Sequence, residues 1–177
     1  MSPRTRLVLA LLALALPLAT LPARAGEHSI GVGIHYWRTV DGLPSGSTFD
    51  DIEDDGNSYV LSYQYQPRGI FTFQVDAELY QDGYGGSTER TILPEVFVLV
   101  GGNFYAGAGA GVAYSDGLED SPSDPFYMGR LGYRLTLLGS IELDVHATYR
   151  FDEWDELENI DVDTDTYTFG AVLRVGL

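Results

Sequence analysis

The strongest constraint in this sequence is a strict alternation of apolar and polar residues. The segment SIELDVHATYRF, residues 140–151, shows it most clearly: Ile141, Leu143 and Val145 alternate with Glu142, Asp144 and His146. Successive side chains of a β-strand point to opposite sides, so this pattern predicts a strand with one apolar and one polar face. Comparable segments predict eight strands, at about residues 30–40, 57–65, 70–80, 91–100, 104–114, 126–137, 141–151 and 166–177.

The connections between these segments alternate in length. Long connections cover residues 41–56, 81–90, 115–125 and 152–165, and short turns lie within YQPRG, GGN and LGS. In an up-and-down meander, this alternation gathers the long loops at one end and both termini at the other. An even number of strands also allows the sheet to close into a barrel without free edges.

Two classes of barrel fit the pattern, and they differ in which face lies inside. A soluble ligand-binding barrel turns its apolar residues inward, whereas a membrane-spanning barrel turns them towards lipid. Here the apolar face is filled on every expected strand, which is more bulk than an eight-stranded barrel can enclose. Aromatic residues gather at both ends of that face, as the two membrane interfaces favour. We therefore predict an all-β, eight-stranded, antiparallel up-and-down transmembrane β-barrel, with the soluble barrel as the alternative.

The polar face is expected to point into a packed polar interior. It carries many glycines, which suit a crowded lumen, and acidic residues that nearly balance its arginines. Buried charges must be paired, so we predict an ion-pair network inside the barrel. Its expected members are Asp76, Glu78, Glu95, Arg130, Arg134, Glu142, Asp144, His146, Arg150 and Arg174, with His35 on the same face. The short LGS turn predicts a register that places Arg134 opposite Asp144, and an ion pair between them.

The first 25 residues have the features of a cleavable signal peptide. Arg4 and Arg6 precede an uncharged apolar run at residues 7–22, and Ala23-Arg24-Ala25 supplies a small-residue cleavage site. A membrane anchor is the alternative, but the run is short and contains Pro17 and Pro22. We expect export, cleavage before Gly26, and one barrel domain over residues 26–177.

The charge of the chain is strongly acidic, with ten arginines, no lysine and 26 acidic residues. Without Arg4, Arg6 and Arg24, seven arginines face 26 acids, a formal charge of −19. This balance argues against a nucleic-acid partner. The chain contains no cysteine, so neither disulfides nor thiol chemistry contributes.

Most of the acidic residues fall in the four long connections. Twenty acids lie there against Arg90 alone, and a solvated, repulsive surface is the simplest interpretation. A hard divalent cation such as Ca²⁺ at the rim is a second hypothesis, because carboxylates recur at alternate positions in DIEDDGN and DVDTD. Departures from the EF-hand pattern at Glu53 and Ser62 argue against a true EF-hand. The candidate ligands are Asp51, Glu53, Asp55, Asp161, Asp163 and Asp165. No other cofactor is expected.

The strand pattern, the run PEVFVLVGGNFYAGAGAGVAYSDG and the closing TYTFGAVLRVGL resemble the small outer-membrane β-barrel family. That superfamily includes the OmpA membrane domain, OmpX and the opacity-type proteins, and the resemblance covers nearly all of residues 26–177. It implies a monomer in the outer membrane of a Gram-negative bacterium, in contact with lipid and lipopolysaccharide. It also implies insertion by the barrel-assembly machinery, which reads the last strand; in this chain Leu177 replaces the usual terminal aromatic residue.

The family has no shared activity, so the function must be argued from the residues. The expected role is structural or interactive, with the barrel presenting four acidic extracellular loops. Alternatives are a cation-binding rim that bridges to lipopolysaccharide or a partner, and a narrow porin-like channel. A lipid A-modifying enzyme is a further, weaker alternative. It would need a catalytic histidine at the rim or facing lipid, whereas His35 and His146 fall on the inward face and His28 lies on the expected periplasmic side. We expect no enzymatic activity.

Overall fold

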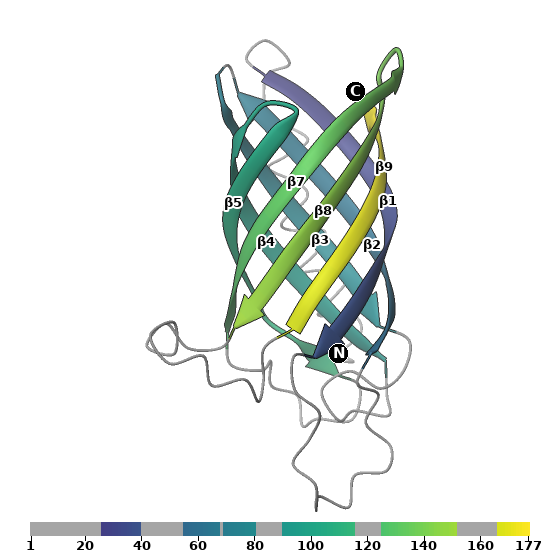
Figure 1. The fold of residues 1–177 in the computed structure, drawn as a ribbon, viewed down its shortest axis with the longest axis vertical. Coiled ribbons are helices and arrows are strands. Elements are labelled where there is room, and N and C mark those ends of the chain that lie inside the picture. The colour runs from purple at the N-terminus through teal and green to yellow at the C-terminus, as the bar shows by residue number, and fades with distance from the viewer. Residues whose placement is uncertain (1–25, 40–54, 68, 81–89, 116–124, 152–165) are drawn as a thin grey trace, which may run out of the picture.

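The computed structural model describes residues 26–39, 55–67, 69–80, 90–115, 125–151 and 166–177. Their secondary structure consists of β-strands (Figure 1). The strands are β1 (Gly26–Thr39), β2 (Asp55–Pro67), β3 (Phe71–Tyr80), β4 (Thr91–Gly101), β5 (Phe104–Gly111), β6 (Tyr114–Ser115), β7 (Phe126–Leu138), β8 (Ile141–Phe151) and β9 (Thr166–Gly176). No helix in this part of the chain has the length and apolar character to cross a bilayer.

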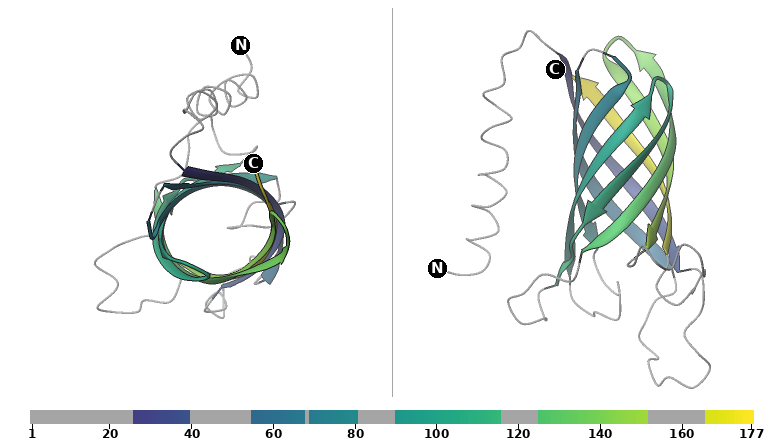
Figure 2. Two further views of the ribbon diagram at one scale, coloured as in Figure 1. Left: turned by 90° about the horizontal axis from the view of Figure 1, so that it is seen from above. Right: turned by 90° about the vertical axis from the view of Figure 1, so that its left-hand side faces the viewer.

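The strands form one closed antiparallel barrel, which Figure 2 shows as a ring when seen along its axis. Each of the long strands pairs with its neighbours in the chain, with β6 continuing the line of β5 along β4. Pairing of β9 with β1 joins the two ends of the meander, so no long strand is left with a free edge. The predicted up-and-down barrel of eight full-length strands is confirmed.

The three short turns and the C-terminus lie at one end of the barrel (Figure 1). Gly101 and Gly139 have positive φ values of 138° and 58°, conformations that residues with a β-carbon rarely adopt. Between β7 and β8 the register places Arg134 opposite Asp144, as the LGS turn predicts. A β-bulge between Thr136 and Leu138 takes up one residue next to this turn.

The segment predicted as a single strand over residues 104–114 is interrupted in the structure. β5 ends at Gly111, and pairing with β4 resumes only at Tyr114 in β6, in the same register. The interruption lies opposite Pro94, whose carbonyl accepts a hydrogen bond of 3.3 Å from the Val112 N–H. Proline has no N–H to donate in return, so the ladder loses a hydrogen bond at this point.

The two faces of the barrel have opposite chemistry. Outward side chains are apolar and exposed, for example Val32 at 62% and Leu61 at 57% of their full accessible area. Inward charged side chains are almost completely enclosed, with Arg174 and Asp144 at 0%. A soluble barrel would show the reverse arrangement, so the chain folds as a transmembrane β-barrel with buried polar residues inside.

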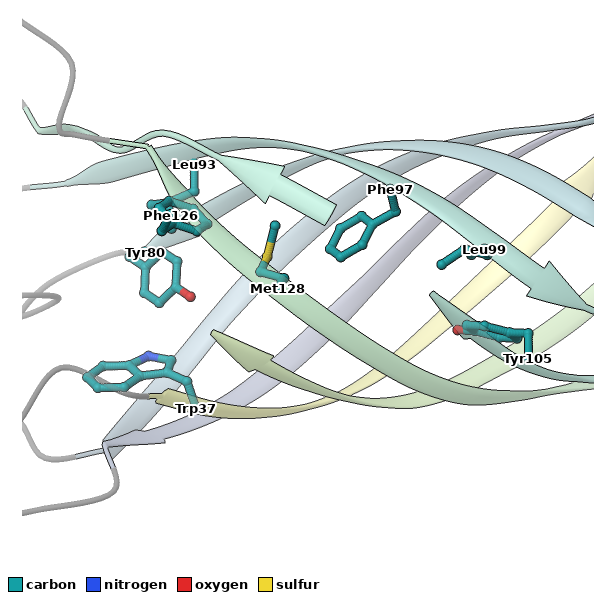
Figure 3. Packing of buried hydrophobic residues seen from close by; sticks show 8 residues of the cluster. All are labelled: Trp37, Tyr80, Leu93, Phe97, Leu99, Tyr105, Phe126 and Met128. Carbon is teal, nitrogen blue, oxygen red and sulfur yellow. The ribbon is translucent and has the colours of Figure 1, made fainter. Parts of the chain in front are cut away.

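The interior also contains an apolar cluster that the sequence pattern did not predict. Its members are Trp37, Tyr80, Leu93, Phe97, Leu99, Tyr105, Phe126 and Met128, most of them from β4, β5 and β7 (Figure 3). Glycines on neighbouring strands make room for the aromatic rings. A β-carbon at Gly132 would lie 2.3 Å from the Tyr105 ring, and one at Gly109 would lie 2.4 Å from the Phe97 ring. The inward glycines are therefore needed for the packing of the lumen.

Candidate functional site: the polar interior of the barrel

Asp76 and Arg130 form one centre of the polar interior. Arg130 Nη1 donates to Asp76 Oδ2 at 2.9 Å, and its Nε donates to the Thr148 hydroxyl at 2.8 Å. The other carboxylate oxygen of Asp76 accepts a hydrogen bond from Ser62, and Gln74 donates to Oδ2 at 2.6 Å. Both charges are thus neutralised and hydrogen-bonded away from water, which a buried ion pair requires.

A second centre lies nearer the long connections, where Arg150 bridges two carboxylates. Arg150 Nη2 lies 2.7 Å from Glu95 Oε1 and 3.3 Å from Glu78 Oε2. Glu78 also accepts hydrogen bonds from Ser58 and from His35 Nδ1. Glu95 Oε2 lies 3.8 Å from Arg130 Nη2, and this contact connects the second centre to the first.

Asp144 is the carboxylate of the third centre, nearer the short turns. It accepts hydrogen bonds from Arg174 Nε at 3.0 Å and from the Tyr105 hydroxyl at 2.7 Å. Arg174 Nη1 donates to the Ser62 hydroxyl at 2.9 Å. A β-carbon at Gly31 would lie 2.9 Å from Arg174 Cγ, so the glycine leaves the space through which this side chain enters the lumen.

The predicted ion pair between Arg134 and Asp144 is wrong, although the two residues are opposite each other in the ladder. Asp144 pairs with Arg174 instead. The Arg134 guanidinium lies over the Tyr105 ring, 4.5 Å from its centroid, and its Nε and Nη2 have no hydrogen-bond partner among the described residues. Glu142 is only partly buried and forms no ion pair within the described part of the chain.

Arg130 and Arg150 also stack on aromatic rings. Arg130 lies 3.7 Å from the centroid of Phe97, and Arg150 lies 4.5 Å from that of Phe126. Such cation–π contacts strengthen when the cation is removed from water. The arginines therefore join the polar and apolar halves of the interior, which is a role that the alternation of the sequence did not reveal.

Two histidines complete the polar interior. His35 and His146 face each other with their Nε2 atoms 3.1 Å apart, and His146 Nδ1 lies 3.4 Å from Asp144 Oδ1. With this contact, the three centres form a closed ring of ion pairs and hydrogen bonds across the lumen. We call it the interior network; it runs through Asp144, His146, His35, Glu78, Arg150, Glu95, Arg130, Asp76, Ser62 and Arg174 back to Asp144.

The predicted cation site at the rim lies mostly outside the described residues. Asp51, Glu53, Asp161, Asp163 and Asp165 belong to segments that the structure does not describe. Asp55, the remaining candidate, begins β2 and accepts a hydrogen bond of 2.7 Å from the Tyr36 hydroxyl. The cation site therefore stays a prediction.

His28 lies on the opposite side of the barrel wall from the other two histidines. It is partly buried near the start of β1, bonded through Nδ1 to the Tyr63 hydroxyl at 2.6 Å and stacked on Tyr65. The pairing of Gly26 with Pro67 puts this group at the end that carries the short turns. His28 therefore packs with the aromatic residues at that end of the outer face and is not part of the interior network.

Comparison with known proteins agrees with this architecture. No family model matches the chain, and no curated protein matches its sequence. Among solved structures, Neisserial surface protein A matches with a TM-score of 0.58 and 18% identity over 84% of this chain and 96% of that one. A de novo designed transmembrane β-barrel matches with a TM-score of 0.50 and 12% identity over 89% of this chain and 100% of the design.

A third match, the outer membrane protein OprG from Pseudomonas aeruginosa, has a TM-score of 0.46 and 14% identity, over 86% of this chain and 94% of that one. The identities of the first two matches establish a shared fold and leave function open. The closed antiparallel barrel, its apolar outer face and those two matches lead to one conclusion: the chain has the fold of a small eight-stranded transmembrane β-barrel.

Proposed function

We propose that the protein is exported to the outer membrane, where its barrel is a closed anchor that presents four acidic loops at the cell surface. The observation that carries the proposal is the contrast between the two faces. An apolar belt covers the outside, and paired charges fill the inside. Residues 1–25 would direct export and be removed.

The filled interior supports an anchor over a channel. Arg130, Arg150 and Arg174 extend into the lumen, and each retains at most 3% of its full accessible area. A conducting pore needs wetted side chains along its length, whereas eight strands leave little room once side chains enter. The narrow-channel alternative would require the interior network to break.

The acidic connections support a role in surface interaction. Their carboxylates would repel one another and remain hydrated, and they would attract cationic groups or divalent cations. Bridging of these loops to lipopolysaccharide through a cation is compatible with the same charge pattern. The enzyme alternative gains no support, because His35 and His146 are enclosed within the interior network.

Cell fractionation combined with surface proteolysis tests this proposal. The mature protein should sediment with outer membranes and migrate differently in heated and unheated samples on SDS gels. On intact cells, a glutamate-specific protease should cut in the long connections, for example after Glu53 or Glu156, and leave Glu78 and Glu95 in the barrel uncut.

A variant lacking residues 1–25 is the matched control and should stay in the cytoplasm. Recovery of the full-length protein as a soluble periplasmic monomer would contradict the proposal. Cleavage at Glu53 and Glu156 only after the outer membrane is opened would show that the loops face the periplasm.

A further inference from the structure

The contact between His35 and His146 constrains which ring nitrogens carry hydrogens. Both residues are buried, at 1% and 6% exposure, and their rings meet edge to face with centroids 5.0 Å apart. The two Nε2 atoms are 3.1 Å apart. At that distance, one nitrogen must donate a hydrogen to the other, because two lone pairs facing each other would repel.

Counting hydrogens on the four ring nitrogens shows what the pair must hold. His35 Nδ1 lies 2.8 Å from Glu78 Oε1, and His146 Nδ1 lies 3.4 Å from Asp144 Oδ1. An ionised carboxylate only accepts hydrogen bonds, so each Nδ1 must carry a hydrogen. The Nε2–Nε2 contact requires a third. Two neutral imidazoles have two such hydrogens in total, so the observed contacts need one additional proton and one positive charge shared by the pair.

The flanking carboxylates remain available as acceptors because cationic and hydroxyl donors hold them ionised. Asp144 receives Arg174 and the Tyr105 hydroxyl, and Glu78 receives Arg150 and Ser58. A proton shared by the histidines would therefore lie between two negative charges.

The charge balance of the whole interior agrees with this count. The charged side chains that face inward and are buried or partly buried come from β3, β4, β7, β8 and β9. They are Asp76, Glu78, Glu95, Glu142 and Asp144 against Arg130, Arg134, Arg150 and Arg174. Strands β1, β2 and β5 contribute the polar side chains of His35, Ser58 and Tyr105. Counted formally with all carboxylates ionised, five carboxylates minus four guanidiniums leave one negative charge, which one shared proton would balance.

The enclosure of the pair favours a proton over a larger cation. A β-carbon at Gly170 would lie 2.4 Å from His146 Nε2 and 2.6 Å from His35 Cδ2, so backbone closes this side of the contact. Among the described residues, no group of three or more histidine, cysteine, aspartate or glutamate side chains is arranged to hold a metal ion. Two imidazoles alone do not complete the coordination that metal sites in proteins use.

We propose that His35 and His146 form a binding site for one proton inside the barrel, shared between their Nε2 atoms and flanked by Glu78 and Asp144. The site joins β1 to β8 over Gly170 of the intervening strand β9, and its proton completes the interior network.

The shared proton links the stability of the barrel to pH. Free histidines titrate near pH 6.5, so the unfolded chain binds two protons on these residues at lower pH and none well above that value. The folded pair binds one. Below pH 6.5 the unfolded state binds more protons, and stability rises with pH. Above pH 6.5 the folded state binds more protons, so stability falls as pH rises. The unfolding equilibrium constant increases by up to tenfold per pH unit until the shared proton is lost. The pair therefore contributes most near pH 6.5.

Unfolding of the refolded barrel by urea in phospholipid vesicles, measured between pH 5 and pH 9, tests this. The wild type should become less stable as pH rises above about 7. His35→Gln and His146→Gln should each remove that dependence, and the double variant should behave like either single one. His28→Gln is the matched control and should keep the wild-type dependence, because His28 lies outside the lumen. An identical pH dependence in His35→Gln, His146→Gln and the wild type would overturn the proposal.

A spectroscopic measurement on the wild type covers the case in which the variants do not fold. NMR of the barrel labelled with ¹⁵N-histidine should show a scalar coupling between the two Nε2 nuclei at neutral pH, together with hydrogens on both Nδ1 atoms. Two neutral rings without this coupling, each titrating independently, would also overturn the proposal.

Discussion

Individual residues inside this barrel are constrained by charge pairing and by space at the same time. Arg174 illustrates both, since it pairs with Asp144 and Ser62 and passes over Gly31. Arg134 sits opposite the same carboxylate but stacks on Tyr105. The two arginines therefore offer a direct comparison between a guanidinium with an ionic partner and one that has none among the described residues.

Arg174→Ala should destabilise the barrel by about 3 kcal/mol, because it leaves Asp144 buried without its cation. Arg134→Ala should cost less, about 1 kcal/mol, since it removes a cation–π contact rather than the ionic partner of a carboxylate. Urea unfolding in lipid vesicles measures both. Replacing Arg174 and Asp144 together by apolar residues should cost less than the sum of the two single changes. Equal losses for the two arginine variants would show that the assignment of the pair is incorrect.

Gly132 tests the space requirement in β7, and Gly129 in the same strand is its control. A β-carbon at Gly132 would meet the Tyr105 ring, whereas one at Gly129 would meet no atom within 4 Å. Gly132→Ala should lower the free energy of unfolding by about 1–3 kcal/mol through overpacking. Gly129→Ala should leave it within about 0.5 kcal/mol of the wild type. If both variants matched the wild type, the interior would be looser than the structure shows.

At the scale of the strands, alternation was enough to predict every long strand and the direction of its faces. It could not predict the interruption of the strand opposite Pro94. The missing N–H of this proline has an effect only because β5 pairs with β4 at that point. The sequence of β4 also does not show clear alternation, because Leu93 and Phe97 make its inward face apolar as well as its outward face. The partner of Asp144 was missed for a similar reason. Register gives the neighbours in the ladder, but the room that Gly31 leaves for Arg174 depends on the closed barrel.

The outward face of the strands should respond to charge according to depth. Leu61 lies at the middle of β2, and Leu138 ends β7 next to a short turn; both are exposed, at 57% and 76%. Leu61→Arg should cost about 2–4 kcal/mol in a bilayer, and Leu138→Arg about 0–1 kcal/mol. Vesicle-based unfolding of the two variants measures the difference. A small and equal effect at both positions would be evidence that this face does not contact the hydrocarbon core.

For the whole molecule, the apolar exterior and the charge-paired interior fit the proposed role of a membrane anchor without an open path through it. The arginines that fill the lumen also lie against Phe97, Phe126 and Tyr105, so ionic and stacking contacts hold them in place together. Movement of one side chain would break several contacts at once. This coupling is the physical basis for proposing an anchor.

Single-channel recording on the refolded protein in a planar lipid bilayer tests that claim most directly. The closed ring of side chains across the lumen predicts a flat current at the baseline level over the voltages that the bilayer tolerates. Insertion should be verified in the same preparation by the heat-dependent shift on SDS gels. Reproducible steps to a defined open level, carried by the verified monomeric barrel, would contradict the account and identify the protein as a channel.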